Sequence, residues 1–265
     1  MATHTTHFDK ISLLVTHFNR SKSLERLLSK LREHGVSFAE TIVSDGGSNS
    51  EHLRYVNHLR LDFGFTLLTT TENKGLGNSI NVGQDAAKTP YILYIQEDFV
   101  PKSDIIPVLT DAFNIMEHEE EWDIIRFYAF PWARFPYLKP YKKGFSEMVF
   151  HIAPWYTDHT KFFAYSDHPH LKRRSFPEKF GRYYETLSGD VTEMKMCRSF
   201  LRHKGKGLYY HHDNDLFEHD NPLEEPGQVR EAQLKRQRLR QLPALRWAYL
   251  KYRMLRDTVL LLQNK

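Results

Sequence analysis

The sequence predicts an α/β fold in which a mostly parallel sheet is flanked by helices. Over the first hundred residues, short apolar runs rich in branched side chains alternate with segments whose leucines recur at helical spacing. Such alternation is typical of right-handed βαβ units, whose parallel strands are covered on both faces. The C-terminal part is instead predicted to be a helical extension, and no linker separates independent domains.

The individual elements follow from the spacing of apolar residues. Leu24, Leu27, Leu28 and Leu31 lie at i, i+3, i+4 and i+7, which is one face of a helix. The predicted strands are 11–15, 41–43, 65–69, 91–95, 122–128 and 205–210. The predicted helices are 24–31, 53–59, 80–87, 105–116, 192–203 and 229–262. The aromatic, proline-broken residues 130–165 receive no assignment.

The composition indicates a globular intracellular protein. Of the 265 residues, 40% are hydrophobic and 14% aromatic, which is enough to fill a core. Cys197 is the only cysteine, so no intrachain disulfide can form and a reducing, cytoplasmic compartment is expected. The start of the chain does not resemble a signal peptide, and there is no apolar run of about 18 residues to cross a membrane.

Polar residues follow each of the first four predicted strands. They are Thr16 to Arg20, Asp45 to Ser48, Asn73 to Asn78, and the pair Glu97 and Asp98. In an open parallel sheet, ligands bind at the carboxyl ends of the strands, so these residues are candidates for one site. The adjacent carboxylates could hold a metal ion, although a surface turn would also explain them. The partial GxG at Gly75 follows the third strand, which argues against a dinucleotide fold, and no P-loop is present.

The same residues resemble a known family. ISLLVTHFNR, ETIVSDGGSNS and ENKGLGNSINVGQDAAKTPYILYIQEDF, in this order, resemble a family 2 glycosyltransferase with the GT-A fold. The resemblance covers about the first hundred residues. It implies that Asp45 hydrogen-bonds the nucleotide base and that Glu97 faces the sugar or ribose. It also implies a nucleotide-sugar donor, whose further contacts would be Thr16, Asn19, Arg20, Asn73, Gly75 and Asn78.

The metal motif of this family is altered here. The family has Asp-x-Asp after the fourth strand, whereas this chain has Gln96, Glu97 and Asp98. Alignment on the last aspartate makes Asp98 the expected ligand of Mn²⁺ or Mg²⁺. Hard divalent ions prefer oxygen ligands and keep positions for the diphosphate and water. The resemblance also suggests His219 as a late metal-binding histidine, although a lone histidine is more often structural.

The second half supplies candidates for the chemistry. In inverting members of the family, the base is an Asp or Glu at the start of a helix, and Glu193 is the first candidate with Asp190 second. Helix capping would explain Asp190, and attraction to the helix dipole would explain Glu193. Arg173 and Arg174 could hold the diphosphate, because guanidinium forks match phosphate oxygens. A solvated basic loop is the alternative for these two arginines.

The last residues form a basic amphipathic tail. Trp247, Tyr249 and Tyr252 interleave with leucines, lysines and arginines. Such a helix can lie on anionic lipid, pack on the domain or bind nucleic acid. The family context favours a peripheral position on the inner face of a membrane, with no nucleic acid as partner.

The predicted organisation is a GT-A domain over residues 1–227 and a tail over 228–265. Residues 1–101 would form the nucleotide-binding half, and 102–227 the acceptor-binding half. The predicted activity is transfer of a sugar to a saccharide acceptor, free or lipid-linked, with a divalent metal and inversion. The alternatives are a nucleotidyltransferase of the same fold and a catalytically silent protein that binds nucleotide sugar or nucleic acid.

Overall fold

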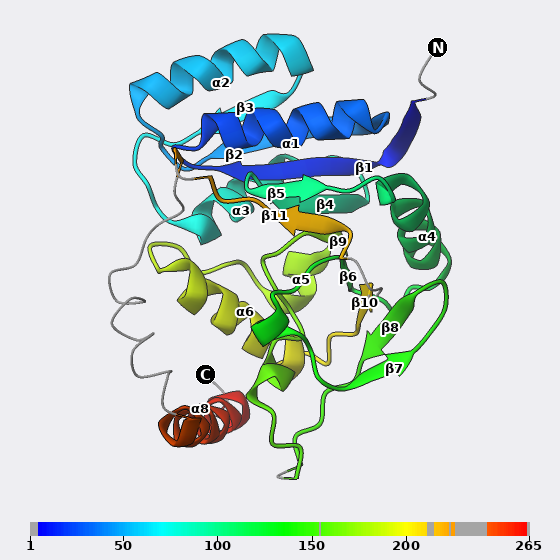
Figure 1. Ribbon diagram of the computed structural model, residues 1–265, viewed down its shortest axis with the longest axis vertical. Coiled ribbons are helices and arrows are strands. Elements are labelled where there is room, and N and C mark those ends of the chain that lie inside the picture. The colour runs from blue at the N-terminus through cyan, green and yellow to red at the C-terminus, as the bar shows by residue number, and fades with distance from the viewer. Residues whose placement is uncertain (1–4, 154, 211–214, 223, 226–242, 264–265) are drawn as a thin grey trace.

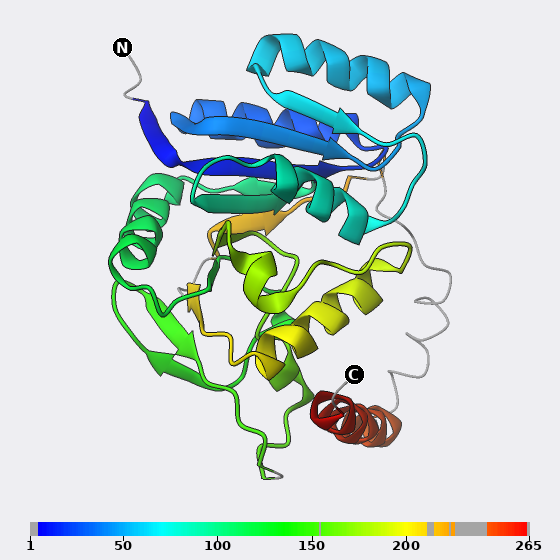
Figure 2. The ribbon, with the colours of Figure 1, turned by 180° about the vertical axis from the view of Figure 1, so that it is seen from behind.

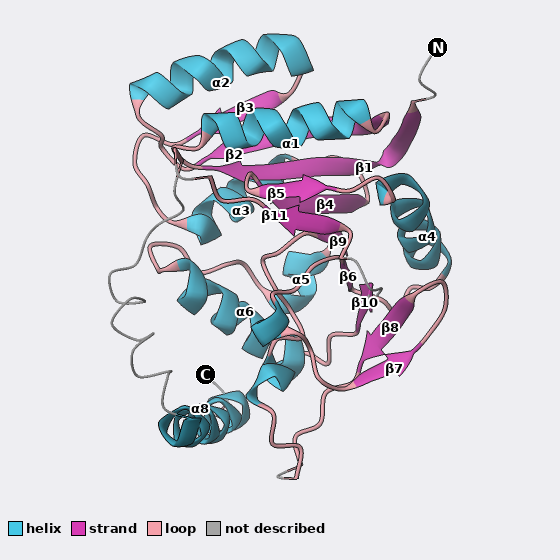
Figure 3. Cartoon of the chain, in the orientation of Figure 1, coloured by secondary structure: helices cyan, strands magenta, loops and turns pink. Residues whose placement is uncertain are grey.

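The computed structural model describes residues 5–153, 155–210, 215–222, 224–225 and 243–263. Within these residues the main sheet has nine strands, in the order β3-β2-β1-β4-β9-β6-β10-β8-β7 (Figures 1 and 3). The strands are β1 (Thr6–His17), β2 (Val36–Asp45), β3 (Thr66–Thr69), β4 (Tyr91–Gln96), β5 (Phe99–Pro101), β6 (Ile124–Arg126), β7 (Leu138–Pro140), β8 (Phe145–Met148), β9 (His170–Arg173), β10 (Gly207–Tyr210) and β11 (Phe217–His219). The helices are α1 (Ser21–Glu33), α2 (Ser50–Phe63), α3 (Leu76–Ala86), α4 (Ile105–His118), η1 (Pro131–Ala133), η2 (His159–Phe162), α5 (Phe176–Phe180), α6 (Gly189–Arg202) and α8 (Pro243–Leu262).

The N-terminal half is the expected parallel sheet. β1 pairs in parallel with both β2 and β4, and β2 pairs in parallel with β3. Helices α1 and α2 cover one face, and α3 covers the other, as the views from front and back show (Figures 1 and 2). Successive side chains of β1 point to opposite faces, so Leu13 joins the core that contains Leu27, whereas Leu14 joins the core that contains Ile80.

The second half makes the sheet mixed. β9 lies between β4 and β6 and is antiparallel to both, while β10 is parallel to β6 and antiparallel to β8. The predicted strand over 122–128 is shorter, at Ile124–Arg126. Residues 130–165, which the sequence left unassigned, form β7, β8 and two short 3₁₀ helices.

The C-terminal helix α8 packs against α6 and η2 (Figure 1). His159 Nε2 lies 2.8 Å from Asp257 Oδ2, and both side chains are buried. Arg202 of α6 donates to the carbonyl of Leu260 at 3.0 Å, and Leu261 is buried in the core below α3 and α6. The part of the predicted tail before Pro243 lies outside the described residues. In the described parts of the chain, no helix has both the length and the apolar character needed to cross a bilayer.

Candidate functional site

Asp45 organises the ends of β1 and β2. Register places His17 beside Asp45, and His17 Nδ1 lies 2.8 Å from Asp45 Oδ1. His17 Nε2 accepts from the backbone N–H of Arg20, so the proton that His17 donates to Asp45 is on Nδ1. Ser48 donates through its hydroxyl and its backbone N–H, and Thr69 donates at 2.8 Å. Burial opposes ionisation, but these hydrogen bonds outweigh it and lower the pKa of Asp45 to about 2.

These hydrogen bonds decide whether Asp45 has an acceptor free for a nucleotide base. Both oxygens of Asp45 accept hydrogen bonds from the protein, and the residue is only 1% exposed. A carboxylate offers about four acceptor positions, so a base would have to displace a protein donor. In this structure Asp45 therefore holds the loop in place, and it does not present a vacant acceptor.

Thr16 and Asn19 also fix the loop after β1. Thr16 Oγ1 lies 3.1 Å from the Tyr94 hydroxyl inside the sheet. Asn19 adopts a left-handed backbone with φ 53°, its N–H donates to the Ser48 hydroxyl, and its side chain accepts from the backbone N–H of Asn49. Both residues lie at the predicted edge of the sheet, and each already has a partner within the protein.

Asp98 and His219 meet beside the end of β4. β11 pairs with β5 in an antiparallel fashion, and this pairing places His219 opposite Phe99. As a result, His219 Nε2 lies 3.1 Å from Asp98 Oδ2. Arg20 donates to the same oxygen at 2.7 Å, while Asp98 Oδ1 is buried and has no hydrogen-bond partner. The expected pair of metal ligands is therefore in contact, with one buried carboxylate oxygen unused.

Arg20 connects the adjacent carboxyl groups of Glu97 and Asp98 to the chain after β11. Its Nη2 donates to Asn221 and its Nε to the backbone carbonyl of Glu225. Burial, and then repulsion from Asp98, raise the pKa of Glu97 to about 8, with Arg20 acting in the opposite direction. Burial also opposes ionisation of Asp98, but His219 and Arg20 outweigh it and lower its pKa. One guanidinium thus faces two buried carboxyl groups of which one keeps its proton at neutral pH.

The loop before α3 positions the segment that leads into α6. Asn73 accepts from the Gly75 N–H, and Asn78 donates to Glu185 at 2.8 Å. Gly75 has φ +82°, and a Cβ at Gly77 would lie 2.0 Å from the carbonyl of Tyr184. Only glycine permits this approach. The residues expected to contact nucleotide therefore also fix the approach to α6.

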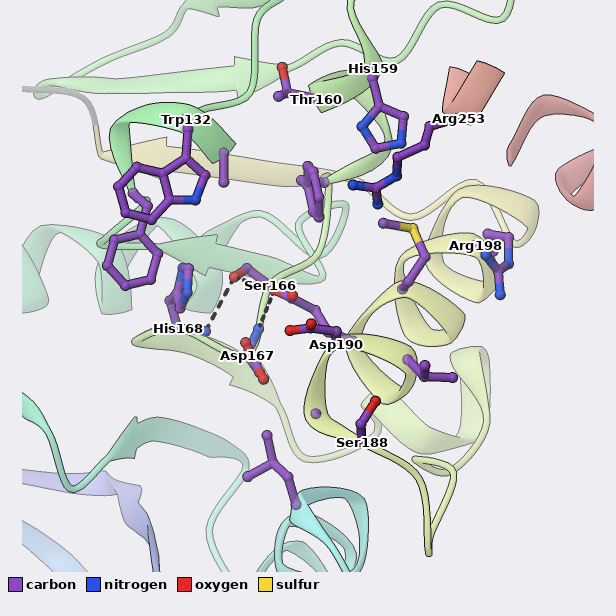
Figure 4. A pocket seen from close by; sticks show the side chains of 18 of the residues that line it. Trp132, His159, Thr160, Ser166, Asp167, His168, Ser188, Asp190, Arg198 and Arg253 are labelled. Carbon is purple, nitrogen blue, oxygen red and sulfur yellow. Dashed lines mark hydrogen bonds between the residues drawn. The ribbon is translucent and has the colours of Figure 1, made fainter. Parts of the chain in front are cut away.

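A cleft of about 1200 Å³ opens beside this edge (Figure 4). Gln96, Phe99 and His219 line it on the side of the sheet. Asp190 and Glu193, three residues apart on α6, line it as well, so both candidate bases face the space beside the candidate metal ligands. Further lining comes from η1, η2 and α8, including Trp132, Thr160 and Arg253.

Glu193 belongs to a cluster that the sequence did not predict. Glu193 Oε1 accepts from the Ser166 hydroxyl at 2.8 Å, and ligand atoms of Asp167, His168 and Glu193 lie within 4.8 Å of one another. Burial, and then the Glu193 carboxylate, hold the pKa of Asp167 well above its usual range. Burial lowers the pKa of His168 to about 3. This cluster places Glu193 beside a second carboxyl group and also offers a second set of metal donors.

Arg126, at the end of β6, was also missed. It is 1% exposed and lines the cleft, and its Nη1 donates to the carbonyl of Phe163 at 2.5 Å. Its Nε and Nη2 have no hydrogen-bond partner. A buried cation with unused donors attracts an anion. No motif marks it, because the sequence placed this arginine inside a predicted strand over 122–128, with no neighbouring residue that pointed to a ligand.

The prediction for Arg173 and Arg174 is wrong in this structure. Because β9 runs antiparallel to β4, Arg173 pairs with Tyr91 at the beginning of β4, at the opposite edge from Asp98. Arg173 donates to the carbonyls of Trp122 and Met116, and Arg174 donates to that of Lys88. Both side chains thus fasten loops at the far edge of the sheet, and neither can reach a diphosphate at the ends of β1 and β4.

The fold and this edge define a GT-A-type α/β protein, and comparisons with known proteins give the family. The model of glycosyl transferase family 2 matches residues 12–199, more than half of the sequence, so the chain belongs to that family. A search of curated proteins finds no match.

Solved structures support the fold. TarS of S. aureus is 17% identical with a TM-score of 0.58, over 78% of this chain and 36% of that chain. GalNAc-T7 is 15% identical with a TM-score of 0.54, over 76% of this chain and 42% of that chain. This chain thus spans less than half the length of either structure. At these identities the likeness shows the fold alone, and it confirms the GT-A prediction.

Proposed function

We propose that this protein transfers a sugar from a nucleotide-sugar donor to a saccharide acceptor, with a divalent metal ion at Asp98. The contact between Asp98 and His219, which lines the same cleft as Glu193, carries the proposal. TarS has been solved in complex with UDP-GlcNAc, and GalNAc-T7 with UDP, GalNAc and Mn²⁺. The family membership and these neighbours support a nucleotide sugar as donor.

The residues present fit a divalent ion. Asp98 keeps one buried oxygen without a partner, and His219 offers an imidazole nitrogen 3.1 Å from the other oxygen. Carboxylate and imidazole ligands together suit Mn²⁺, which then keeps positions for phosphate oxygens. When bound, the ion would neutralise charge on the departing nucleoside diphosphate. Glu97, buried next to Asp98, would hydrogen-bond the ribose or sugar.

Glu193 is proposed as the general base. The Ser166 hydroxyl orients its carboxylate, and Asp167 retains its own proton because of burial and the neighbouring charge. Glu193 can then accept the proton of an acceptor hydroxyl as that oxygen attacks the anomeric carbon, which supports inversion. Asp190, on the same helix and in the same cleft, is the second candidate.

The Asp167, His168 and Glu193 cluster is assigned to the acceptor side and not to the metal. A carboxylate that ligates a divalent cation is a poor acceptor of a proton, so one residue cannot serve as metal ligand and base at once. Asp98 and His219 leave Glu193 available for the proton. In this proposal Asp98 binds the metal ion, and Glu193 accepts the proton.

The exposed face of α8 is proposed to rest on an anionic membrane. Lys251 accompanies a row of exposed apolar side chains. These side chains are Leu245, Tyr252, Leu255, Val259 and Leu262, and Trp247 lies nearby. Such a face binds anionic bilayers through apolar burial and charge. Co-sedimentation with vesicles should therefore require anionic lipid and fall when Leu255 and Val259 are both replaced by Ser, and equal sedimentation of the variant would refute it.

Nucleotide-sugar binding gives the direct test of the donor site. Thermal unfolding of the full chain would be followed with a panel of nucleotide sugars, with Mn²⁺ or with a chelator. A ligand at 100 times its Kd stabilises the native state by about 2.7 kcal/mol, so the matching donor should raise the melting temperature. Asp98→Ala should abolish the metal-dependent part of this rise. If no nucleotide sugar stabilises the wild type, or the variant responds equally, the donor site is misassigned.

A further inference from the structure

The end of the cleft away from the sheet is lined by arginines. Arg198 of α6 and three arginines of α8 face it, whereas the candidate bases lie in the first turns of α6. The arginines of α8 are Arg246, Arg253 and Arg256. At about 1.5 Å per residue, the Cα of Arg198 lies roughly 12 Å along α6 from that of Asp190 and about 8 Å from that of Glu193. Figure 4 shows Arg253 beside His159 on the far side of the cleft from Ser188.

The charges at this end are only partly balanced. Asp257, which is fully buried, accepts from His159 and Arg256 at 2.8 Å and lies 3.6 Å from Arg198. This one carboxylate is thus shared between two arginines and a histidine. Among the described residues, Arg246 and Arg253 have no carboxylate within 4.0 Å, and the Nε atom of Arg253 is buried without a partner.

Arg126 adds an independent observation at the floor of the same cleft. Its guanidinium is almost fully buried, and two of its nitrogen atoms have no partner. Burying unused cationic donors costs free energy, and an anion in the cleft would satisfy them. The unused donors of Arg126 and Arg253 therefore come from different elements, β6 and α8, and line one cavity.

We propose that the acceptor carries a phosphate group, which Arg253 and Arg246 bind at the α8 end of the cleft, with Arg126 facing the same cavity from β6, while the acceptor hydroxyl reaches Glu193. This inference names the acceptor class and rests on the proposed transferase function. Four arginines and one aspartate line or border this end, a net charge of three, and a dianionic phosphate balances it better than a single carboxylate. Guanidinium forks also match phosphate oxygens in geometry.

The separation along α6 sets the size of the acceptor. Arg198, which lines the same end of the cleft, lies about one turn and a half of α6 from Glu193, so a phosphate at this end and a hydroxyl at the base would belong to one ligand of saccharide dimensions. The phosphate can belong to a soluble sugar phosphate or to a lipid headgroup, since both present the same oxygens.

Binding of glycerol 3-phosphate to the full-length chain tests the site without knowledge of the acceptor. Calorimetry should show binding of glycerol 3-phosphate but not of glycerol, and Arg253→Gln should weaken it at least tenfold. Arg246→Gln, at an exposed position where folding is not at risk, should also weaken it. Arg54→Gln, on the distant and exposed surface of α2, is the matched control and should bind as the wild type does.

Two further experiments identify the source of the phosphate and test the donor site separately from the phosphate site. If vesicles that contain phosphatidic acid bind the wild type but not Arg253→Gln, the phosphate belongs to a lipid. If glycerol 3-phosphate binds and the vesicles do not, the phosphate belongs to a soluble ligand. Nucleotide binding with Mn²⁺ should persist in Arg253→Gln and be lost in Asp98→Ala. If the wild type does not bind nucleotide, the proposed donor site is refuted but the phosphate site is not. Absent phosphate binding, or equal binding by Arg253→Gln and the wild type, would refute the phosphate site alone.

Discussion

Replacement of Asp45 by Asn tests how the loop after β2 is held. The pKa of Asp45 falls from its ordinary value of 3.8 to about 2. Each pKa unit corresponds to about 1.4 kcal/mol, so the ionised carboxylate stabilises the fold by about 2 kcal/mol at neutral pH. The amide keeps one acceptor but turns an N–H₂ group toward donors such as Ser48 and Thr69. The loss of a charged hydrogen bond, about 1.5–3 kcal/mol, gives a similar figure.

The sign of the pH dependence follows from the lowered pKa. The stabilisation is complete above the ordinary pKa and is lost as the pH falls through about 2. Urea unfolding at pH 7, 5, 4 and 3 should show Asp45→Asn about 2 kcal/mol less stable at pH 7, with roughly half of the difference remaining at pH 3. Asp9→Asn, at an exposed carboxylate, is the control and should change little. A difference that does not depend on pH, or no difference at pH 7, would refute the reasoning.

Four further substitutions test other parts of the site. Glu193→Gln should leave nucleotide affinity nearly unchanged and reduce turnover by about 10²–10⁴, whereas Asp190→Asn should cost about 1 kcal/mol of stability or less. Steady-state kinetics with the donor found by thermal screening would check both variants. If Asp190→Asn is the inactive variant, Asp190 and not Glu193 is the base. Arg20→Lys should weaken metal-dependent nucleotide binding by about tenfold or more, because an ammonium cannot replace the guanidinium fork; unchanged affinity would contradict this. Gly77→Ala should lower the melting temperature and the activity together, since its Cβ would meet the carbonyl of Tyr184 at 2.0 Å; a normal melting curve would show that this contact relaxes easily.

The first four strands could be predicted because each contains a short apolar run, which is buried in β1, β2 and β4 and half-buried in β3. Their polar ends meet at one edge for the same reason, since parallel strands share their carboxyl side. Asp98 and His219 could be paired only through the family resemblance, because they are far apart in sequence and are brought together by the small sheet of β5 and β11, with Asp98 in the turn just before β5.

The second half could not be predicted to the same depth. β9 has the sequence HLKR, in which no alternation of apolar and polar residues marks a strand. Lys172 is nevertheless fully buried, with its Nζ 2.9 Å from the Tyr183 hydroxyl and 5.2 Å from the ring centroid of Phe176. The antiparallel path of this strand removes Arg173 from the site and places His168 in it. Tertiary contact, and not local pattern, decides both outcomes.

The arginines of α8 show a second limit. A basic helix at the end of the sequence predicts a surface partner, and its outer face fits that expectation. Its inner face, however, lines the cleft because the buried pair of His159 and Asp257 docks the helix on η2. Neither residue belongs to a recognisable motif, so the role of Arg253 became visible only in three dimensions.

Release of nucleoside diphosphate tests the central claim most directly. The wild type, given the donor that stabilises it, an acceptor fraction and Mn²⁺, should release nucleoside diphosphate, and a chelator should stop the reaction. Asp98→Ala should be slower by about 10²-fold or more, since a metal ion supplies several kcal/mol at the leaving group. Asp9→Ala, at an exposed aspartate, should be as active as the wild type. Equal release by Asp98→Ala and the wild type would contradict the account.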